Sequence, residues 1–239
     1  MQMLPANPTI ENLAPEVVAK TIDHALLRPD LTTQQVIDGC KLSADYQVAS
    51  VCVRPCDVSL AASHLQNTGV AIGTVIGFPH GTTSTAAKVA ESLQALADGA
   101  TELDMVLNIG YAKSGQWSKV QEDIRAVVVA AKGRYAGCCV KVIFECCLLA
   151  EGEIRKACWV CEEAGADFVK TSTGFSTGGA RIEDLKAMRG CTSVARTGVK
   201  ASGGIRSLED LAACLQAGAT RIGTSATAAI INDLRARRK

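Results

Sequence analysis

The apolar positions of this chain follow two patterns in turn, one typical of buried strands and one typical of amphipathic helices. The changes from one pattern to the other indicate where the strands and helices begin and end. Short apolar runs that are typical of buried strands recur along its whole length. Between them, apolar residues follow the i, i+3, i+4, i+7 spacing of amphipathic helices, as in 86–97, 117–131 and 208–215. We predict eight strands, near 21–26, 48–53, 71–77, 101–107, 139–145, 167–171, 197–202 and 220–224.

A helix can be placed after each predicted strand, and an extra one before the first, around 9–20. Strands that alternate with helices indicate a parallel sheet. Eight such units in a chain of 239 residues favour a closed (β/α)8 TIM barrel over an open doubly wound sheet, which usually has fewer strands at this length. No linker or low-complexity tract interrupts the pattern, so we expect residues 1–239 to form a single domain.

A weak internal repeat supports the same organisation. Each copy runs from the end of a helical pattern through Gly-Ala into an apolar strand, and the copies are 97–104, 163–170 and 216–223. Glycine readily adopts the left-handed conformation that ends a helix. We therefore expect Gly99, Gly165 and Gly218 to end three helices.

Composition narrows the class of protein. The hydrophobic fraction of 48% is enough for a large core, and a net charge of +1 gives no sign of a nucleic-acid partner. The chain has no apolar run of about 18 residues and no secretory signal pattern, so we expect no membrane association and a cytoplasmic location. Eleven cysteines, an odd number, suggest free thiols in a reducing compartment. Cys158 and Cys161 form a CxxC, but they lie on the apolar side of a predicted helix, and no metal site is expected.

In a barrel of this kind, reactive side chains lie at the carboxyl ends of the strands. Five residues with polar or reactive side chains occur late in otherwise apolar strands: Asp23, Cys52, Asp104, Lys170 and Lys200. His24 follows Asp23 directly, points to the opposite face of its strand, and is interpreted as a packing residue.

Lys170 is the sharpest of these signals. Lys170 and Lys200 lie on neighbouring predicted strands, so both ammonium groups can point into the barrel. Two nearby ammonium groups lower each other's pKa. A free lysine is neutral in only about one molecule in 2,500 at pH 7, and a pKa lower by about three units would make it a competent nucleophile for a carbonyl. The alternative is that each lysine pairs with a carboxylate and only stabilises the barrel.

Asp104 requires a cationic partner because it lies inside an apolar strand. Lys200 is the natural candidate and Lys141 a rival. Asp104 would relay protons beside the nucleophile, or form a structural ion pair, and the two roles are compatible. Cys52 either faces the substrate pocket or serves as a small core residue.

A glycine-rich pattern after the last two strands indicates a phosphate site. Barrels often bind phosphate with these two loops and a short helix N-terminus. The residues assigned to this site are Gly203, Gly204, Arg206, Gly223, Thr224 and Ser225. The glycines would let backbone N–H groups approach the oxygens, and the two hydroxyls could donate hydrogen bonds. Ordinary turns remain the alternative.

Together these segments resemble the deoxyribose-phosphate aldolase family. The resemblance rests on Ile22–Leu27, Ser50–Val53, Glu102–Val106, Lys141–Glu145, Phe168–Phe175 and Val199–Arg206, which occur in family order. The most specific are Lys-Thr-Ser-Thr-Gly, from Lys170, and Lys-Ala-Ser-Gly-Gly-Ile-Arg, from Lys200.

The resemblance implies reversible cleavage of 2-deoxy-D-ribose 5-phosphate to D-glyceraldehyde 3-phosphate and acetaldehyde, a step of deoxyribonucleotide breakdown, without a cofactor or metal. It assigns Lys170 as the Schiff-base lysine and Asp104 and Lys200 as its proton-handling partners. It also implies a substrate pocket that includes Asp23, Cys52, Lys141 and Thr173. The phosphate site would extend to the loop of Gly174.

Two positions depart from some family members. Phe175 stands where longer members have lysine, and no tyrosine follows Tyr135, although some members carry a C-terminal tyrosine near the site. Phosphate binding would then depend more on the backbone and Arg206, and water would fill the tyrosine's role.

Three other functions stay open from the sequence: a Schiff-base aldolase for another sugar phosphate, a sugar-phosphate isomerase, and a silent barrel that binds sugar phosphates. The expected partners are a small sugar phosphate and an aldehyde. We also expect a homo-oligomer, with a dimer as the first guess, although the sequence pattern identifies no interface.

Overall fold

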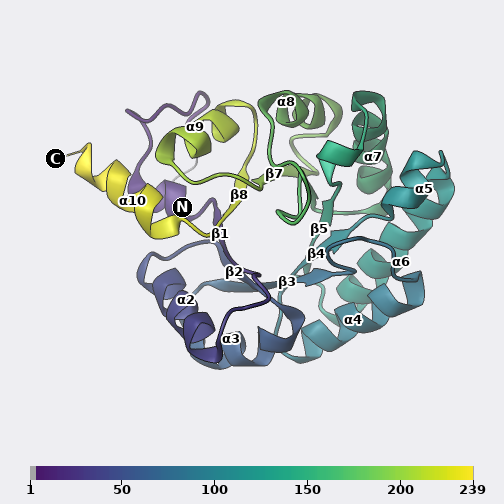
Figure 1. The fold of residues 1–239 in the computed structure, drawn as a ribbon, viewed down its shortest axis with the longest axis horizontal. Helices are drawn as coiled ribbons and strands as arrows, with labels where there is room; N and C mark the ends of the chain where they lie inside the picture. The colour runs from purple at the N-terminus through teal and green to yellow at the C-terminus, as the bar shows by residue number, and fades with distance from the viewer. Residues whose placement is uncertain (1–3, 239) are drawn as a thin grey trace.

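The computed structural model describes residues 4–238 and shows a closed barrel of eight parallel strands (Figure 1). The strands are β1 (Ile22–Leu26), β2 (Ser50–Val53), β3 (Ala71–Ile76), β4 (Glu102–Val106), β5 (Cys139–Ile143), β6 (Phe168–Lys170), β7 (Gly198–Ser202) and β8 (Arg221–Thr224). Each strand pairs with the next in sequence, and β8 pairs with β1 to close the ring. The predicted TIM barrel is confirmed, with every strand within a few residues of its expected position.

Helices surround the barrel on its outside, as Figure 1 shows. They are α1 (Pro15–Ala19), α2 (Thr33–Asp45), α3 (Val58–His64), α4 (Thr85–Ala97), α5 (Ile109–Lys113), α6 (Trp117–Arg134), α7 (Glu151–Ala164), α8 (Ile182–Cys191), α9 (Leu208–Gln216) and α10 (Thr227–Ala236). Gly99, Gly165 and Gly218 have φ values of 109°, 86° and 100°, so the predicted left-handed ends of α4, α7 and α9 are confirmed. No helix within residues 4–238 is long and apolar enough to cross a membrane.

The extra N-terminal helix is shorter than predicted. The expected range was 9–20, but α1 begins only at Pro15, and the residues before it form a turn closed by a hydrogen bond from the Thr9 N–H to the Asn12 side chain (2.8 Å). Proline holds the preceding residue in an extended conformation, as seen for Ala14 (ψ 138°), and proline itself fits the first turn of a helix.

The strands divide apolar and charged side chains between two environments. On β4, Leu103 and Met105 belong to the buried apolar core, while Glu102 and Asp104 alternate with them and are also buried. Because successive strand residues point to opposite faces, the two carboxylates share one face and both enter the barrel interior. Cys158 and Cys161 are fully buried on α7, which confirms that they lie on its apolar side.

One buried ion pair joins two of the outer helices. Lys88 of α4 is fully buried, and its Nζ lies 2.5 Å from a carboxylate oxygen of Asp123 on α6 and 3.0 Å from the Val106 carbonyl. The second carboxylate oxygen of Asp123 accepts a hydrogen bond from the Thr85 hydroxyl (2.8 Å). Every polar atom of the pair is therefore partnered inside the protein.

Removing one member of this pair is predicted to cost much more stability than removing a surface pair. Asp123→Ala would leave the Lys88 ammonium buried and uncompensated, which typically lowers the free energy of unfolding by about 3–5 kcal/mol. Glu151→Ala, which breaks an exposed pair with Arg155 on α7, should change it far less. Urea denaturation followed by circular dichroism measures both. Equal losses in the two variants would contradict this assignment.

Candidate active site

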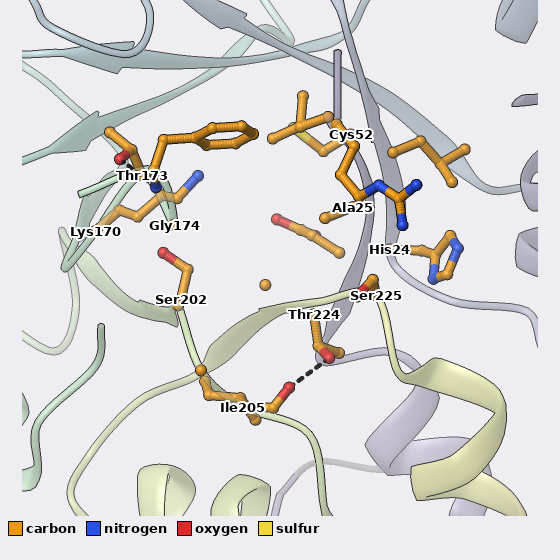
Figure 2. Close-up of a pocket in the computed structure, with 18 of the residues that line it drawn as sticks. His24, Ala25, Cys52, Lys170, Thr173, Gly174, Ser202, Ile205, Thr224 and Ser225 are labelled. Carbon is orange, nitrogen blue, oxygen red and sulfur yellow. Dashed lines mark hydrogen bonds between the residues drawn. The ribbon is translucent and has the colours of Figure 1, made fainter. Parts of the chain in front are cut away.

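A cavity of about 450 Å³ opens at the carboxyl ends of the strands, where barrels place their sites. All the predicted site residues except Asp104 and Lys141 line it. Figure 2 shows Lys170, Thr173 and Ser202 on one side of the cavity, and His24 and Ser225 on the other. The fold thus brings the predicted reactive lysines and glycine-rich loops to one space.

Asp104 lies beneath the cavity, in contact with three lysines. Its Oδ2 is 2.7 Å from Lys170 Nζ and 2.7 Å from Lys200 Nζ, and its Oδ1 is 2.9 Å from Lys141 Nζ. The expected partner Lys200 and its rival Lys141 are thus both present. Lys141 itself does not line the cavity, which corrects its assignment to the substrate pocket: its ammonium is held below by carboxylates.

Lys170 and Lys200 are register partners on adjacent strands, as predicted. Both are buried, and both ammonium groups contact the same oxygen of Asp104. Lys200 has a second carboxylate partner, Asp23, whereas Asp104 is the carboxylate partner found for Lys170. Lys170 is therefore the less compensated of the two lysines.

The pKa values of the two lysines move apart for this reason. Burial lowers the pKa of Lys170 below its ordinary value, because the attraction of Asp104 does not offset the combined effect of burial and the neighbouring Lys200. Burial also acts to lower the pKa of Lys200, but Asp104 and Asp23 outweigh it and raise that pKa. Burial would raise the pKa of Asp104, yet Lys141, Lys170 and Lys200 hold it well below its usual range. The arrangement therefore makes Lys170 easier to deprotonate than Lys200, beside a charged Asp104.

Two further charged side chains of the interior, Glu102 and Arg221, were not among the predicted site residues. Arg221 donates to Asp23 (2.7 Å) and lies 3.4 Å from Glu102, whose other oxygen is 2.5 Å from Lys141. Each is the first residue of its strand, and a polar side chain at a strand end does not by itself indicate a functional site. Their spacing could have identified them. Glu102 lies two residues before Asp104, and Arg221 lies two residues before Gly223, so each shares a strand face with a predicted site residue.

The loops after β6 and β7 approach each other closely at the rim. Gly203 and Gly204 have left-handed φ values of 89° and 83°, and a Cβ on Gly179 would lie only 2.3 Å from the Gly203 carbonyl oxygen. Glycine is the residue that fits both conditions. Gly223 has a different role. A Cβ at this position would lie 3.3 Å from Lys200 Cε, so a glycine leaves room for the Lys200 side chain.

Several hydroxyls at the cavity are already committed. Thr224 donates to the Ile205 carbonyl (2.7 Å, Figure 2), Ser202 donates to the Ser172 carbonyl (2.5 Å), and Thr173 donates to Glu145. This corrects the expectation that the Thr224 hydroxyl is free to donate to a ligand. The hydrogen-bond partner of this hydroxyl depends on loop conformation, which residue types alone do not specify.

The helices after β7 and β8 differ in whether their N-termini are free. The carboxylate of Asp210 accepts hydrogen bonds from the backbone N–H groups of Arg206 (3.0 Å) and Ser207 (3.1 Å), so it already fills the N-terminus of α9. The N-terminus of α10 has no side-chain cap, and Ser225, which precedes it, is exposed in the cavity. A free helix N-terminus therefore faces this region at α10.

Comparison with known proteins identifies the family. The family model described as DeoC/LacD family aldolase matches residues 17–230. The chain belongs to the DeoC/LacD aldolase family. Among its relatives, a deoxyribose-phosphate aldolase of Caldanaerobacter subterraneus subsp. tengcongensis is 49% identical over 216 residues, covering 90% of this chain and 93% of that protein. One from Staphylococcus epidermidis is 52% identical, covering 90% and 96%.

Solved structures give the same family and fold. The tetrameric deoxyribose phosphate aldolase of Aeropyrum pernix superposes with a TM-score of 0.88 at 32% identity, covering 95% of each chain. QR15, an aldolase, superposes with a TM-score of 0.85 at 39% identity, covering 92% of this chain and 97% of that one. The resemblance found in the sequence motifs is thereby confirmed over nearly the whole chain.

The rim of this family member carries two guanidinium groups and an aromatic pair. Arg206 lines the cavity as predicted, and Arg28, which the sequence analysis missed, lines it from the loop after β1 and pairs with Asp30 at 2.8 Å. Phe175 lines the cavity and meets Phe78, from the loop after β3, edge to face at a centroid distance of 5.3 Å. Phe175, where the family resemblance led us to consider a lysine, is therefore part of an apolar contact between the loops after β6 and β3.

A strained acidic residue holds the loop after β6 in place. Glu145 is buried, has a left-handed φ of 57°, and accepts hydrogen bonds from the Thr173 hydroxyl and from the Thr173 N–H (3.3 Å). A left-handed conformation is unfavourable for a glutamate, so surrounding contacts must maintain it. The shape of the loop of Thr173 and Gly174 in this aldolase thus depends on a residue outside the cavity.

No group of three or more His, Cys, Asp or Glu side chains suited to a metal ion occurs in the described part of the chain. The carboxylates below the cavity are all engaged by lysine or arginine.

His24 and Cys52 are neutral members of the lining. The His24 imidazole is buried, its Nδ1 lies 2.9 Å from the Thr227 hydroxyl, and burial lowers its pKa to about 4. The packing role expected for it agrees with these contacts, although it also borders the cavity. Burial raises the pKa of the Cys52 thiol to about 11.

A titration of His24 is predicted to show this effect directly. NMR of the imidazole should give a midpoint near pH 4, compared with about 6.5 in an unfolded chain. Because the folded state binds this proton less readily, stability should be lost as the pH falls below about 6.5, and His24→Gln should remove that part of the pH dependence. A midpoint at the ordinary value would contradict burial of the neutral ring.

Proposed function

We propose that this chain is a class I aldolase that reversibly cleaves 2-deoxy-D-ribose 5-phosphate to D-glyceraldehyde 3-phosphate and acetaldehyde through a Schiff base on Lys170. The observation that carries the proposal is the placement of Lys170: a buried amine with a lowered pKa borders a cavity whose rim bears three glycine-rich loops. The relatives named deoxyribose-phosphate aldolase, at about half identity over most of the chain, support this substrate.

The first step requires the neutral amine. Lys170 attacks the C1 aldehyde of the open-chain sugar, and loss of water gives an imine. Protonation of the imine makes it an electron sink, so the electrons of the C2–C3 bond can flow toward nitrogen when that bond breaks. Burial and the neighbouring Lys200 lower the pKa of Lys170, which increases the fraction of neutral amine available to the substrate.

Asp104 and Lys200 are placed to manage protons around this step. A water held by these two residues removes the proton of the C3 hydroxyl as the C2–C3 bond breaks, and glyceraldehyde 3-phosphate leaves. The remaining enamine takes a proton at C2, and hydrolysis of the imine releases acetaldehyde and restores Lys170. Because Lys170 and Lys200 meet the same oxygen of Asp104, protons need to travel only a short distance.

The phosphate would bind at the rim, away from the broken bond. The backbone of Gly174, Gly203 and Gly204, the exposed Ser225 and the uncapped N-terminus of α10 border this region. Arg206 and Arg28 add positive charge. Binding energy at the phosphate then holds the aldehyde end near Lys170.

The cellular setting is also a proposal. The eleven cysteines of the chain are free thiols, which fits a reducing cytoplasm. Assembly of this chain into a homo-oligomer is supported by the tetrameric relative from Aeropyrum pernix; a dimer was our expectation from the sequence.

Reductive trapping tests the central step. Incubation with deoxyribose 5-phosphate or acetaldehyde followed by borohydride should attach a two-carbon group to the Lys170 peptide, detected by mass spectrometry. Lys170→Ala should abolish both the adduct and turnover, and Lys170→Arg should do the same while keeping a positive charge. An adduct on Lys200 would reverse the assigned roles. Normal turnover in Lys170→Ala would overturn the Schiff-base proposal.

A substrate pair tests the phosphate end. Arg206→Gln should lower kcat/KM for deoxyribose 5-phosphate by about tenfold, the typical effect of losing one charge-assisted hydrogen bond. The same change should leave kcat/KM for unphosphorylated deoxyribose unaltered. Arg155→Gln, on the outer helix α7, is the matched control. Equal losses on the two substrates would show that Arg206 does not act on the phosphate.

A substrate panel separates the remaining functions. A ketose phosphate accepted in preference to deoxyribose 5-phosphate would indicate a Schiff-base aldolase for another sugar. Isomerisation of a sugar phosphate without any trapped adduct would indicate an isomerase. Binding without turnover of any of these compounds would indicate a silent binding protein.

A further inference from the structure

We propose that Glu102 and Arg221 set the protonation state of Lys170 by fixing the charge balance of the barrel interior, although neither residue lines the substrate cavity. Both would be positioning residues that act through other side chains. This inference rests on the proposed role of Lys170 as the nucleophile and extends it to the residues that keep the amine neutral.

The interior charge cluster consists of seven ionisable side chains joined by direct contacts. Its members are Asp23, Glu102, Asp104, Lys141, Lys170, Lys200 and Arg221. Three are carboxylates and four are bases, so full ionisation would leave a net charge of 4 − 3 = +1 in the interior. Burial of an unbalanced charge is costly, and a group that can release its proton does so.

The contacts identify which base gives up its proton. Lys141 meets all three carboxylates, at 3.2, 2.5 and 2.9 Å. Arg221 meets Asp23 and Glu102, and Lys200 meets Asp23 and Asp104. Lys170 meets Asp104 alone, on an oxygen already shared with Lys200. Lys170 therefore has the least compensation, and its ammonium is the surplus charge.

Arg221 makes this surplus permanent. A guanidinium is not deprotonated in proteins, so the positive charge that Arg221 adds cannot be released at Arg221 itself. It occupies Asp23 Oδ1 at 2.7 Å and the Glu102 carboxylate at 3.4 Å. Negative charge that could otherwise stabilise a lysine ammonium is thereby partly neutralised. Glu102 acts in the opposite sense, since its carboxylate is the counterion of Arg221 and Lys141.

The other strands add no charge that would upset this count. On β2, the Cys52 thiol faces Lys170 and is kept protonated, since burial raises its pKa to about 11. On β1, His24 borders the cavity as a neutral ring, and β3 (Ala71–Ile76) carries only uncharged side chains. Glu145, after β5, faces the loop of Thr173.

Substitutions at the two residues should therefore move the pKa of Lys170 in opposite directions. Arg221→Met removes the surplus, leaving three lysines and three carboxylates, and should raise that pKa by roughly one unit. Glu102→Gln increases the surplus and should lower it by a similar amount. The double variant removes one charge of each sign, so its surplus equals that of the unchanged protein. Arg221→Lys keeps the charge and is the conservative control.

The measurement is the initial rate at which acetaldehyde is reductively attached to the Lys170 peptide, followed across about pH 5 to 9 by mass spectrometry. Acetaldehyde has no group that titrates in this range, so differences between variants report on the enzyme. The rate should rise with pH through the pKa of Lys170. We expect the midpoint to be highest in Arg221→Met, lowest in Glu102→Gln, and close to the unchanged protein in the double variant and in Arg221→Lys.

The inference can still be tested if one of the two single variants does not fold. If Arg221→Met does not fold, Glu102→Gln and the double variant still differ only in the Arg221 charge, and the double variant should have the higher midpoint. If Glu102→Gln does not fold, the double variant should lie below Arg221→Met. Midpoints that coincide in all folded variants, or that move in the reverse order, would overturn the inference and leave the Schiff base intact. Absence of any Lys170 adduct in the unchanged protein would overturn the proposed function and this inference with it.

Discussion

The burial of charge inside a closed barrel is the constraint on which the site depends. Seven ionisable side chains enter an interior that most TIM barrels fill with branched apolar residues. Each carboxylate there contacts two or more cations, and Asp104 contacts three lysines. Such a cluster is tolerated only if its charges nearly cancel. A lysine with a single, shared carboxylate is then the natural place for the neutral amine that imine chemistry needs.

The barrel separates two tasks along its axis. Charged side chains on β1, β4, β5, β7 and β8 lie below and beside Lys170, while glycine-rich loops form the rim above. The rim is shaped by contacts that do not face the substrate: Glu145 holds Thr173, Thr224 holds Ile205, and Asp210 caps α9. One end of the cavity is thus suited to an aldehyde and the other to an anion, with a space of about 450 Å³ between them.

Much of this could be predicted from the sequence, for definite physical reasons. Lys170, Lys200 and Asp104 could be identified because burying a charged side chain late in an apolar strand costs free energy unless the charge is paired. The two-residue period of a strand then places these side chains inside the barrel. Glu102 and Arg221 were not predicted because each is the first residue of its strand, where a polar side chain does not by itself indicate a site. Lys141 was placed in the pocket because sequence spacing cannot say how deep in the barrel a side chain ends. The hydroxyls of Thr224 and Thr173 depend on loop conformation, which residue type does not determine.

The most direct test of the account is the pKa of Lys170 itself, measured by NMR of the Nζ resonances in protein labelled with ¹⁵N-lysine. Resonances can be assigned through Lys170→Arg and Lys200→Arg. We expect Lys170 to lose its proton below the ordinary value of about 10.4, while Lys200 stays charged above it. A Lys170 that titrates at or above the ordinary value, with Lys200 deprotonating first, would contradict it.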